Sequence, residues 1–282
     1  MRLLPELRFE CLESTTGNFR KGWSEVSKEA ALLSIEALSV NFGGLKALSN
    51  IYLDLNPGEV VGLIGPNGAG KTTAFNAISG LVPATSGKIS LDGKEHDWPK
   101  PFQLVDLGIA RTLQGVGLFP DLTVLENVMV GANKFAKSGL IRSALGLSHK
   151  DESQIEERAQ LALERVYAGE LANRRADTLS YPDTKRVAIA RALVSEPRIL
   201  LLDEPAGGLG AADISWLNSV ISNLKSICAI ILVEHHMDVV MSVCDRIYVL
   251  NFGEVISSGS VAHVRNDPAV IAAYLGTHAG DV

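Results

Sequence analysis

The run from Gly65 to Thr72 has the residue types and spacing that bind phosphate. It reads Gly65, Pro66, Asn67, Gly68, Ala69, Gly70, Lys71 and Thr72, and such a glycine-rich run lets backbone N–H groups wrap an anion where a helix begins. Lys71 would neutralise β- and γ-phosphate oxygens. The Thr72 hydroxyl would be a ligand of Mg²⁺, which prefers oxygen, and Thr73 extends the site. Because a predicted strand precedes the run, a nucleotide site is favoured over a chance glycine turn.

A second candidate site lies where an apolar run ends in two acids. Ile199 to Leu202 are followed by Asp203 and Glu204, as expected for a buried strand that delivers carboxylates to the edge where α/β sheets bind ligands. Asp203 would hold Mg²⁺ through water, and Glu204 would polarise the attacking water. An apolar strand followed by acids is by itself more often structural. The phosphate-binding run upstream reverses that preference.

Strands and a helix must position the glycine-rich run. We predict short strands before it and a helix that opens at Gly70. The Asp92-Gly93 turn predicts an antiparallel edge next to this core. The predicted strands of this part are Leu33 to Val40, Ile51 to Leu55, Glu59 to Ile64 and Lys88 to Leu91.

The middle of the chain has a helical pattern, from Thr123 to about Ala176. One apolar face is predicted there, because apolar residues recur at helical spacing among Glu and Arg; they are Ile155, Ala159, Leu163 and Val166. Strands are predicted again at Arg198 to Leu202 and Ala229 to Val233, each after a helical run, which indicates parallel crossovers. The tail from Arg246 predicts a hairpin and then a helix through Tyr274.

These patterns predict an α/β fold: a phosphate-loop NTPase core of mostly parallel sheet with flanking helices, an antiparallel β edge and an inserted helical subdomain. We expect residues 1–32 to be an N-terminal extension and 33–282 a single ATPase domain. Within this domain the core would be 33–118 and 183–252, the helical subdomain about 119–182, and the C-terminal tail 253–282.

Composition excludes several classes of partner. The 282 residues carry a net charge of −6 and a pI of about 5.6, so the cationic surface typical of nucleic-acid binding is not expected. The cysteines, Cys11, Cys228 and Cys244, have no metal-ligand spacing and indicate reduced thiols in the cytosol. The first residues do not resemble a secretory signal. Apolar runs are far shorter than the roughly 20 residues that span a bilayer, so another chain would cross any membrane that this protein serves.

The order of these motifs resembles that of ABC ATPases, from roughly Leu33 to the C-terminus. This resemblance implies ATP and Mg²⁺ as cofactors, ATP hydrolysis as the activity, and further site residues. In that family a glutamine after a core strand contacts the metal and the γ-phosphate, and Gln114 matches it. A histidine after the last core strand contacts the γ-phosphate, and by register His235 takes that position. His236 stands where Asp is usual, and we expect it to be a surface histidine.

The family also stacks an aromatic side chain on adenine, which points to Phe42, although an isolated Phe is more often a core residue. Its signature, commonly Leu-Ser-Gly-Gly-Gln, faces the opposite nucleotide of a dimer. Here it reads Leu179 followed by Ser180, Tyr181, Pro182 and Asp183. Pro182 fits the first turn of a helix, but it removes a backbone donor that in this family reaches the γ-phosphate of the opposite nucleotide. The loop that ends at Gly210, where the family usually has Asp or Asn, is a second departure.

Finer features are similar to the branched-chain amino-acid importer group: Val40 to Leu45, the helical insert and the ending Ala273 to Gly276. The resemblance implies transmembrane permease subunits, a second ABC ATPase subunit in a homo- or heterodimer, and indirectly a solute-binding protein. It implies a peripheral location on the cytoplasmic face of the cell membrane. Two alternatives stay open: a nucleotide-gated ABC module with weak or no hydrolysis, and a soluble ABC ATPase unconnected with transport.

Overall fold

The computed structural model describes residues 31–112, 117–135 and 149–277. The expected N-terminal extension therefore lies almost wholly outside the described residues. The chain from Ala31 onward forms one unit by its internal contacts. Within the described ranges, no helix is both long enough and apolar enough to cross a membrane.

A six-stranded sheet forms the centre of this unit, in the order β10-β9-β3-β8-β7-β6. Neighbours from β6 to β9 run parallel, and β10 pairs antiparallel with β9. Both faces of β3, β7 and β8 are buried, which explains why these strands read as continuous apolar runs. The strands are β3 (Val60–Ile64), β6 (Ile109–Arg111), β7 (Ile199–Asp203), β8 (Ala229–Val233), β9 (Arg246–Asn251) and β10 (Glu254–Ser260).

A second, antiparallel sheet has the order β2-β1-β4-β5. Its strands are β1 (Leu33–Phe42), β2 (Leu45–Leu55), β4 (Ser86–Leu91) and β5 (Lys94–His96). The predicted antiparallel edge is confirmed, and the left-handed conformations of Asp92 and Gly93, with φ of 51° and 72°, make the expected tight turn. Strand β2 begins earlier than predicted. Its alternation is broken by register shifts against β1 and by the left-handed Asn50, which has a φ of 49°.

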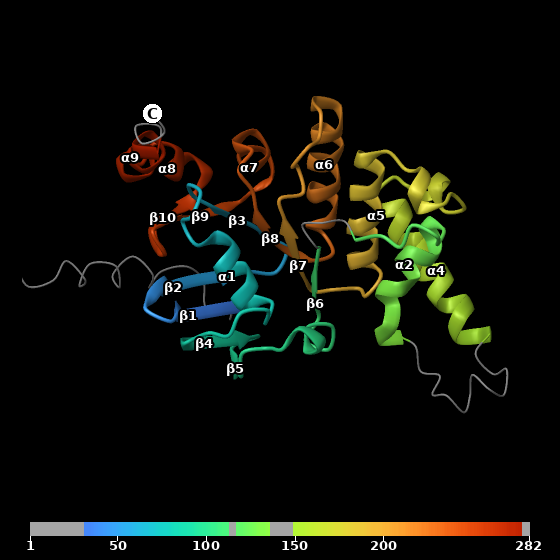
Figure 1. Ribbon diagram of the computed structural model, residues 1–282, viewed down its shortest axis with the longest axis horizontal. Coiled ribbons are helices and arrows are strands. Elements are labelled where there is room, and N and C mark those ends of the chain that lie inside the picture. Colours follow the sequence, from blue (N-terminus) through green and yellow to red (C-terminus); the bar gives the residue numbers. More distant parts are fainter. Residues whose placement is uncertain (1–30, 113–116, 136–148, 278–282) are drawn as a thin grey trace, which may run out of the picture. The chain divides into compact units, whose positions relative to one another are not determined.

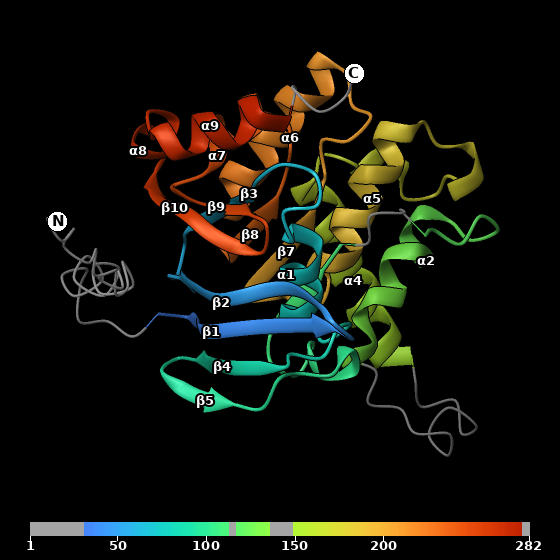
Figure 2. The same ribbon diagram turned by 60° about the vertical axis from the view of Figure 1, so that its left-hand side comes forward.

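The helices cover both faces of the six-stranded sheet (Figure 1). One apolar cluster lies between the two sheets and includes α1; the other joins the opposite face to α5, α6 and α7. Helices α2, α4 and α5 contact one another, and Figure 1 shows them together on the right, away from the antiparallel sheet. Figure 2 shows the antiparallel sheet with its strands in the order β2, β1, β4 and β5. The helices are α1 (Lys71–Ile78), α2 (Val124–Met129), α4 (His149–Arg165), α5 (Tyr181–Leu193), α6 (Ala211–Leu224), α7 (Met237–Val243), α8 (Val261–Arg265) and α9 (Pro268–Thr277).

The predicted apolar face of α4 is confirmed. Ala159, Leu163 and Val166 are buried, and Ile155 packs against the same cluster.

The described cysteines also lie in the interior: Cys228 and Cys244 are buried free thiols, and a Cβ added at Gly62 would come within 2.9 Å of the Cys244 sulfur. Burial raises the pKa of both thiols to about 12.

Candidate functional site

The carboxyl ends of three parallel strands meet at one edge of the six-stranded sheet. Val233 at the end of β8 pairs with Leu63 of β3 and with Asp203 of β7. The loops that follow these strands therefore start at the same level. This register brings together the segments that begin at Gly65, Glu204 and Glu234.

The glycine-rich loop lies between β3 and α1, and two of its glycines are required by close approaches. Gly65 has a φ of 150°, and a Cβ there would lie 2.1 Å from the Leu250 carbonyl oxygen. Gly70 has a φ of 101°, and a Cβ would meet Leu48 at 2.8 Å. No side chain caps α1, and its first turn holds no acid. The open N–H groups and the helix dipole therefore favour an anion at this end.

Lys71 is buried with its ammonium group across this loop. Its Nζ donates to the carbonyl oxygens of Gly65 at 2.7 Å and of Pro66 at 2.8 Å. Burial lowers the pKa of Lys71, and the negative charge of Glu204 opposes that effect. The cation is thus desolvated and close to the carboxylate expected to act on the γ-phosphate.

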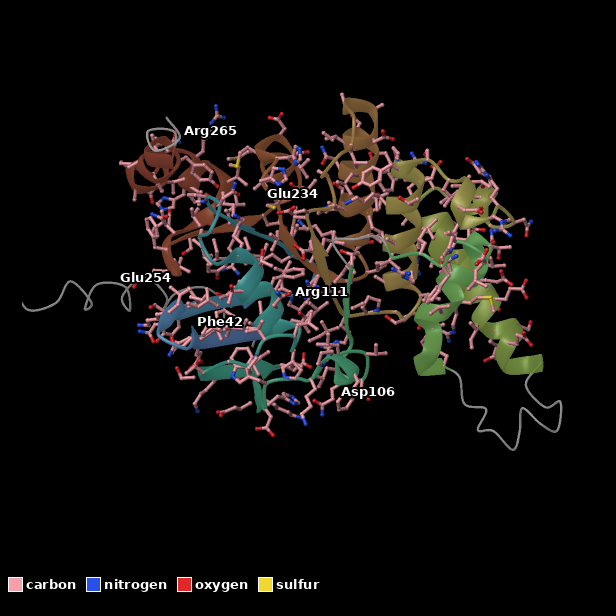
Figure 3. The ribbon with its side chains drawn as sticks, in the orientation of Figure 1. Phe42, Asp106, Arg111, Glu234, Glu254 and Arg265 are labelled. Atoms are coloured by element: carbon pink, nitrogen blue, oxygen red, sulfur yellow. The ribbon has the colours of Figure 1, made fainter. Side chains whose placement is uncertain are left out.

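A cavity of about 490 Å³ lies beside the loop. Its lining includes Phe42, the residues from Asn67 to Thr73, Glu204 and Phe252. Phe42 is 50% exposed and is not a core residue; Figure 3 labels it on the antiparallel sheet. Phe252, which is 86% exposed and lines the same cavity, is a residue that the sequence reasoning missed. The volume and the mixture of aromatic and polar groups suit a nucleotide.

Asp203 is buried and paired with Arg111, which Figure 3 labels. Arg111 Nη2 donates to Asp203 Oδ2 at 3.0 Å, and Nη1 donates to Asn76 Oδ1 at 2.7 Å and Ser79 Oγ at 2.6 Å. Burial raises the pKa of Asp203, while the Arg111 charge acts in the other direction. Arg111, which the sequence analysis did not select, therefore connects the acid at the end of β7 to helix α1.

Glu204 has a left-handed backbone, with a φ of 46°. Its N–H donates to the Val233 carbonyl oxygen at 2.9 Å, and its carbonyl oxygen accepts from Lys185 Nζ at 3.3 Å. The carboxylate lines the cavity, and its Oε1 lies 3.9 Å from His235 Nδ1. Glu204, which is expected to polarise the attacking water, and His235, which is expected to contact the γ-phosphate, are thus neighbours.

The two histidines after β8 have different surroundings. The side chain of His235 is 52% exposed. The side chain of His236 is 33% exposed, and its Nδ1 lies 3.0 Å from Oε2 of the fully buried Glu234. His236 thus lies partly at the surface and also contacts a buried carboxylate.

The donor groups near the loop fit a hard divalent cation. Thr72 and Glu204 line the cavity, and Asp203 ends β7 at the same edge of the sheet. Hydroxyl and carboxylate oxygens are the ligands that Mg²⁺ prefers. Gln114, the further expected metal contact, lies outside the described residues.

The signature segment begins helix α5 and already satisfies its own polar groups. Ser180 Oγ donates to Asp183 Oδ2 at 2.7 Å and accepts from the Asp183 N–H at 3.3 Å. Pro182 lies in the first turn, as predicted. The Tyr181 hydroxyl donates to the Gly207 carbonyl oxygen at 3.2 Å, so this segment also contacts the loop after Glu204.

A glycine-rich loop at the start of a helix, with carboxylates at the end of a parallel strand two positions away in the same sheet, defines a phosphate-loop nucleotide hydrolase. The family model described as "ABC transporter" matches residues 48–207. The model described as "Branched-chain amino acid ATP-binding cassette transporter" matches residues 254–280. The chain belongs to the ATP-binding subunits of the ABC transporter family, which are ATPases.

Several known proteins resemble the chain over most of its length. It is 43% identical to the high-affinity branched-chain amino acid transport ATP-binding protein LivG of Escherichia coli (strain K12), over 87% of this chain and 98% of LivG. The ATP-binding cassette MJ1267 in its ADP conformation matches with a TM-score of 0.75 and 31% identity, over 87% of this chain and 99% of that one. The dimeric post-hydrolysis structure of MJ0796 with ADP and Pi matches with a TM-score of 0.68 and 26% identity, over 81% and 98%.

Proposed function

We propose that this chain is the ATP-hydrolysing subunit of an importer for branched-chain amino acids or a similar small solute. The observation that carries this proposal is the convergence of the glycine-rich loop, Asp203, Glu204 and His235 at one edge of the sheet. The printed names of LivG and of the family model for residues 254–280 support the substrate class. A soluble ATPase unconnected with transport is not favoured by these relatives.

In this proposal each residue of the edge has one task. The loop N–H groups and Lys71 hold the β- and γ-phosphates, and Phe42 stacks on adenine. Thr72, Asp203 and Gln114 hold Mg²⁺, which supplies charge neutralisation on the phosphate oxygens when it is bound. Glu204 orients the attacking water, and His235 contacts the γ-phosphate. Hydrolysis then depends mainly on positioning and electrostatics.

The proposed partners are transmembrane permease subunits on the cytoplasmic face of the cell membrane, with a solute-binding protein acting through them. A second cavity, of about 440 Å³, supports a docking role. Exposed apolar side chains line it, among them Leu81, Phe119 and Val130. It lies between β6 and α5, so a permease segment seated there would contact Arg111, the partner of Asp203.

A second ABC ATPase subunit is also proposed, and the signature segment favours a heterodimer. The Ser180 hydroxyl is engaged by the Asp183 carboxylate, so a phosphate from an opposite nucleotide would have to displace a negative charge. One strong site would then combine the loop of this chain with an intact signature of the partner. The alternative is a homodimer that tolerates the change through backbone shifts.

Purification from membranes tests the transport proposal directly. The full chain should copurify with permease subunits identified by mass, and loss of its gene should lower uptake of radiolabelled leucine. In cells that lack the gene, expression of the natural chain should recover leucine uptake. Expression of the Lys71→Ala variant should not. Normal leucine uptake without the gene would reject the substrate class, and the absence of permease partners would reject the transport role.

A further inference from the structure

Glu234 is a fully buried carboxylate between β8 and α7, labelled in Figure 3. Its Oε1 accepts from the Ala206 N–H at 2.7 Å. Its Oε2 accepts from the N–H groups of His235 at 2.9 Å and His236 at 3.1 Å. One carboxylate therefore joins two loops: the loop after β7, which carries Glu204, and the loop after β8, which carries His235.

The loop after β7 requires such support because of its backbone. Glu204 has a φ of 46°, a left-handed conformation that a non-glycine residue keeps only where the surroundings over-determine it. Two bonds to the β8 side hold this loop: Glu204 N–H to the Val233 carbonyl oxygen at 2.9 Å, and Ala206 N–H to Glu234. The side chain of Glu234 thus fixes the residue two positions after the strained one.

Two other roles for Glu234 fit the contacts less well. Its carboxylate and the rings of His235 and His236 have ligand atoms within 4.8 Å of one another, as a metal site would. However, Oε2 already accepts two backbone N–H groups and faces His236 Nδ1. A passive packing role is also a poor fit, because an apolar side chain would fill the same space without the free-energy cost of burying a charge. Among the described residues, its only ion-pair partners are the two histidine rings.

We infer that Glu234 is a positioning residue for ATP hydrolysis, which holds the loop of Glu204 in register with the loop of His235. The inference rests on the roles proposed above for Glu204 and His235. Glu234 itself does not line the nucleotide cavity. It acts through backbone N–H groups on both sides, so that the acid and the histidine face the same phosphate.

The variant Glu234→Gln tests this assignment, because an amide has one acceptor oxygen and one donor nitrogen. Its NH₂ group must face either the Ala206 N–H or those of His235 and His236, so one loop loses its bond. We expect kcat per nucleotide-binding site to fall at least about tenfold, since small misplacements of reacting groups are costly. KM should stay within about twofold, because the phosphate loop is untouched.

Glu59→Gln is the matched control. Glu59 is also a buried carboxylate, accepting from Asn56 N–H at 2.8 Å and bonded to Arg246, but it precedes β3 at the opposite edge of the sheet. We expect this variant to lower the melting temperature and to leave kcat unchanged. An equal fall of kcat in both variants would mean general destabilisation and would overturn the inference.

Amide hydrogen exchange of the full-length chain separates this inference from the proposed function. Exchange should accelerate in Glu234→Gln in both segments 203–208 and 234–237, and in neither for Glu59→Gln. Unchanged exchange together with parental kcat would overturn the inference even if Glu204→Gln abolishes turnover. Conversely, parental turnover in Glu204→Gln would reject the catalytic role of Glu204, whatever the exchange shows.

A second variant, Glu234→Asp, applies if Glu234→Gln does not fold. The aspartate side chain is too short to reach both loops, so kcat should fall in this variant as well. A kcat equal to that of the parent would overturn the inference.

Discussion

The helix N-termini at α1 and α5 differ in how they meet an anion. At α1 no side chain caps the helix and the first turn has no acid. At α5 Ser180 caps the helix, and Asp183 supplies a carboxylate in the first turn. Both ends carry the positive pole of a helix dipole. At α1 this positive pole is open to a phosphate. At α5 the Asp183 carboxylate in the first turn offsets the positive pole.

The position of a motif in the sequence therefore does not by itself define a nucleotide contact. At the α1 end no side chain caps the helix and no acid lies in the first turn, so a phosphate can reach the helix N-terminus without displacing a side chain. The α5 end must break the Ser180 to Asp183 bond first. We therefore expect changes around α1 to reduce function and changes at α5 to increase it.

The largest effect is expected for Glu204→Gln, which tests whether the α1 side performs hydrolysis. The amide keeps the shape of the side chain but loses the charge that orients water, so kcat should fall by about 10²- to 10⁴-fold. ATP affinity in a calorimetric titration should stay close to that of the parent. Glu196→Gln, an exposed acid paired with Arg158, is the control. Equal turnover in mutant and parent would remove Glu204 from catalysis.

Lys71→Ala should have the next largest effect, because it removes the cation that binds phosphate at the N-terminus of α1. The variant loses a charge-assisted contact to phosphate, so the affinity for MgATP should fall about 10- to 100-fold or become unmeasurable. Lys225→Ala, a lysine paired with Asp245 on the surface, should bind as the parent does. Calorimetry measures both, and unchanged affinity in Lys71→Ala would reject the site.

The double variant Pro182→Gly with Asp183→Gln should make the α5 end resemble the α1 end. The double variant restores a backbone donor and removes the carboxylate. The weakest hydrogen bonds to a charged group already change a binding equilibrium constant about 10-fold. ATPase of the chain alone should therefore rise by about tenfold. Asp177→Asn, which removes an exposed acid nearby, controls for net charge. If the unmodified chain already hydrolyses as fast, the proposed asymmetry is wrong.

Phe42→Ala is expected to have the smallest effect. Stacking of a base on an aromatic ring contributes about 1–3 kcal/mol, and half-exposed Phe42 should lie at the low end, so affinity should fall about fivefold. Phe252→Ala sharpens the assignment, because both rings border the same cavity. A larger loss of affinity in Phe252→Ala would transfer the adenine contact to Phe252.

The sequence predicted those parts of the site that lie in consecutive residues. The glycine-rich loop and the Asp203-Glu204 pair carry their chemistry locally, and strand periodicity placed both at strand ends. Contacts made by convergence of distant loops could not be predicted. The bond between Arg111 and Asp203 spans β6 and β7, and the Glu234 carboxylate meets Ala206 only because β7 and β8 are neighbours. For Asp183 a signal existed, since a serine followed three residues later by an acid is a known capping pattern.

The buried thiols of Cys228 and Cys244 can report how often the core of the protein opens. Because burial raises the pKa of Cys228 and Cys244 to about 12, both thiols are almost fully protonated at pH 8. Alkylating reagents therefore have almost no reactive form to attack while the core is closed. The rate at which these two cysteines are modified should accordingly measure how often the core opens. Nucleotide that rigidifies the phosphate loop should slow that modification, without any engineered probe.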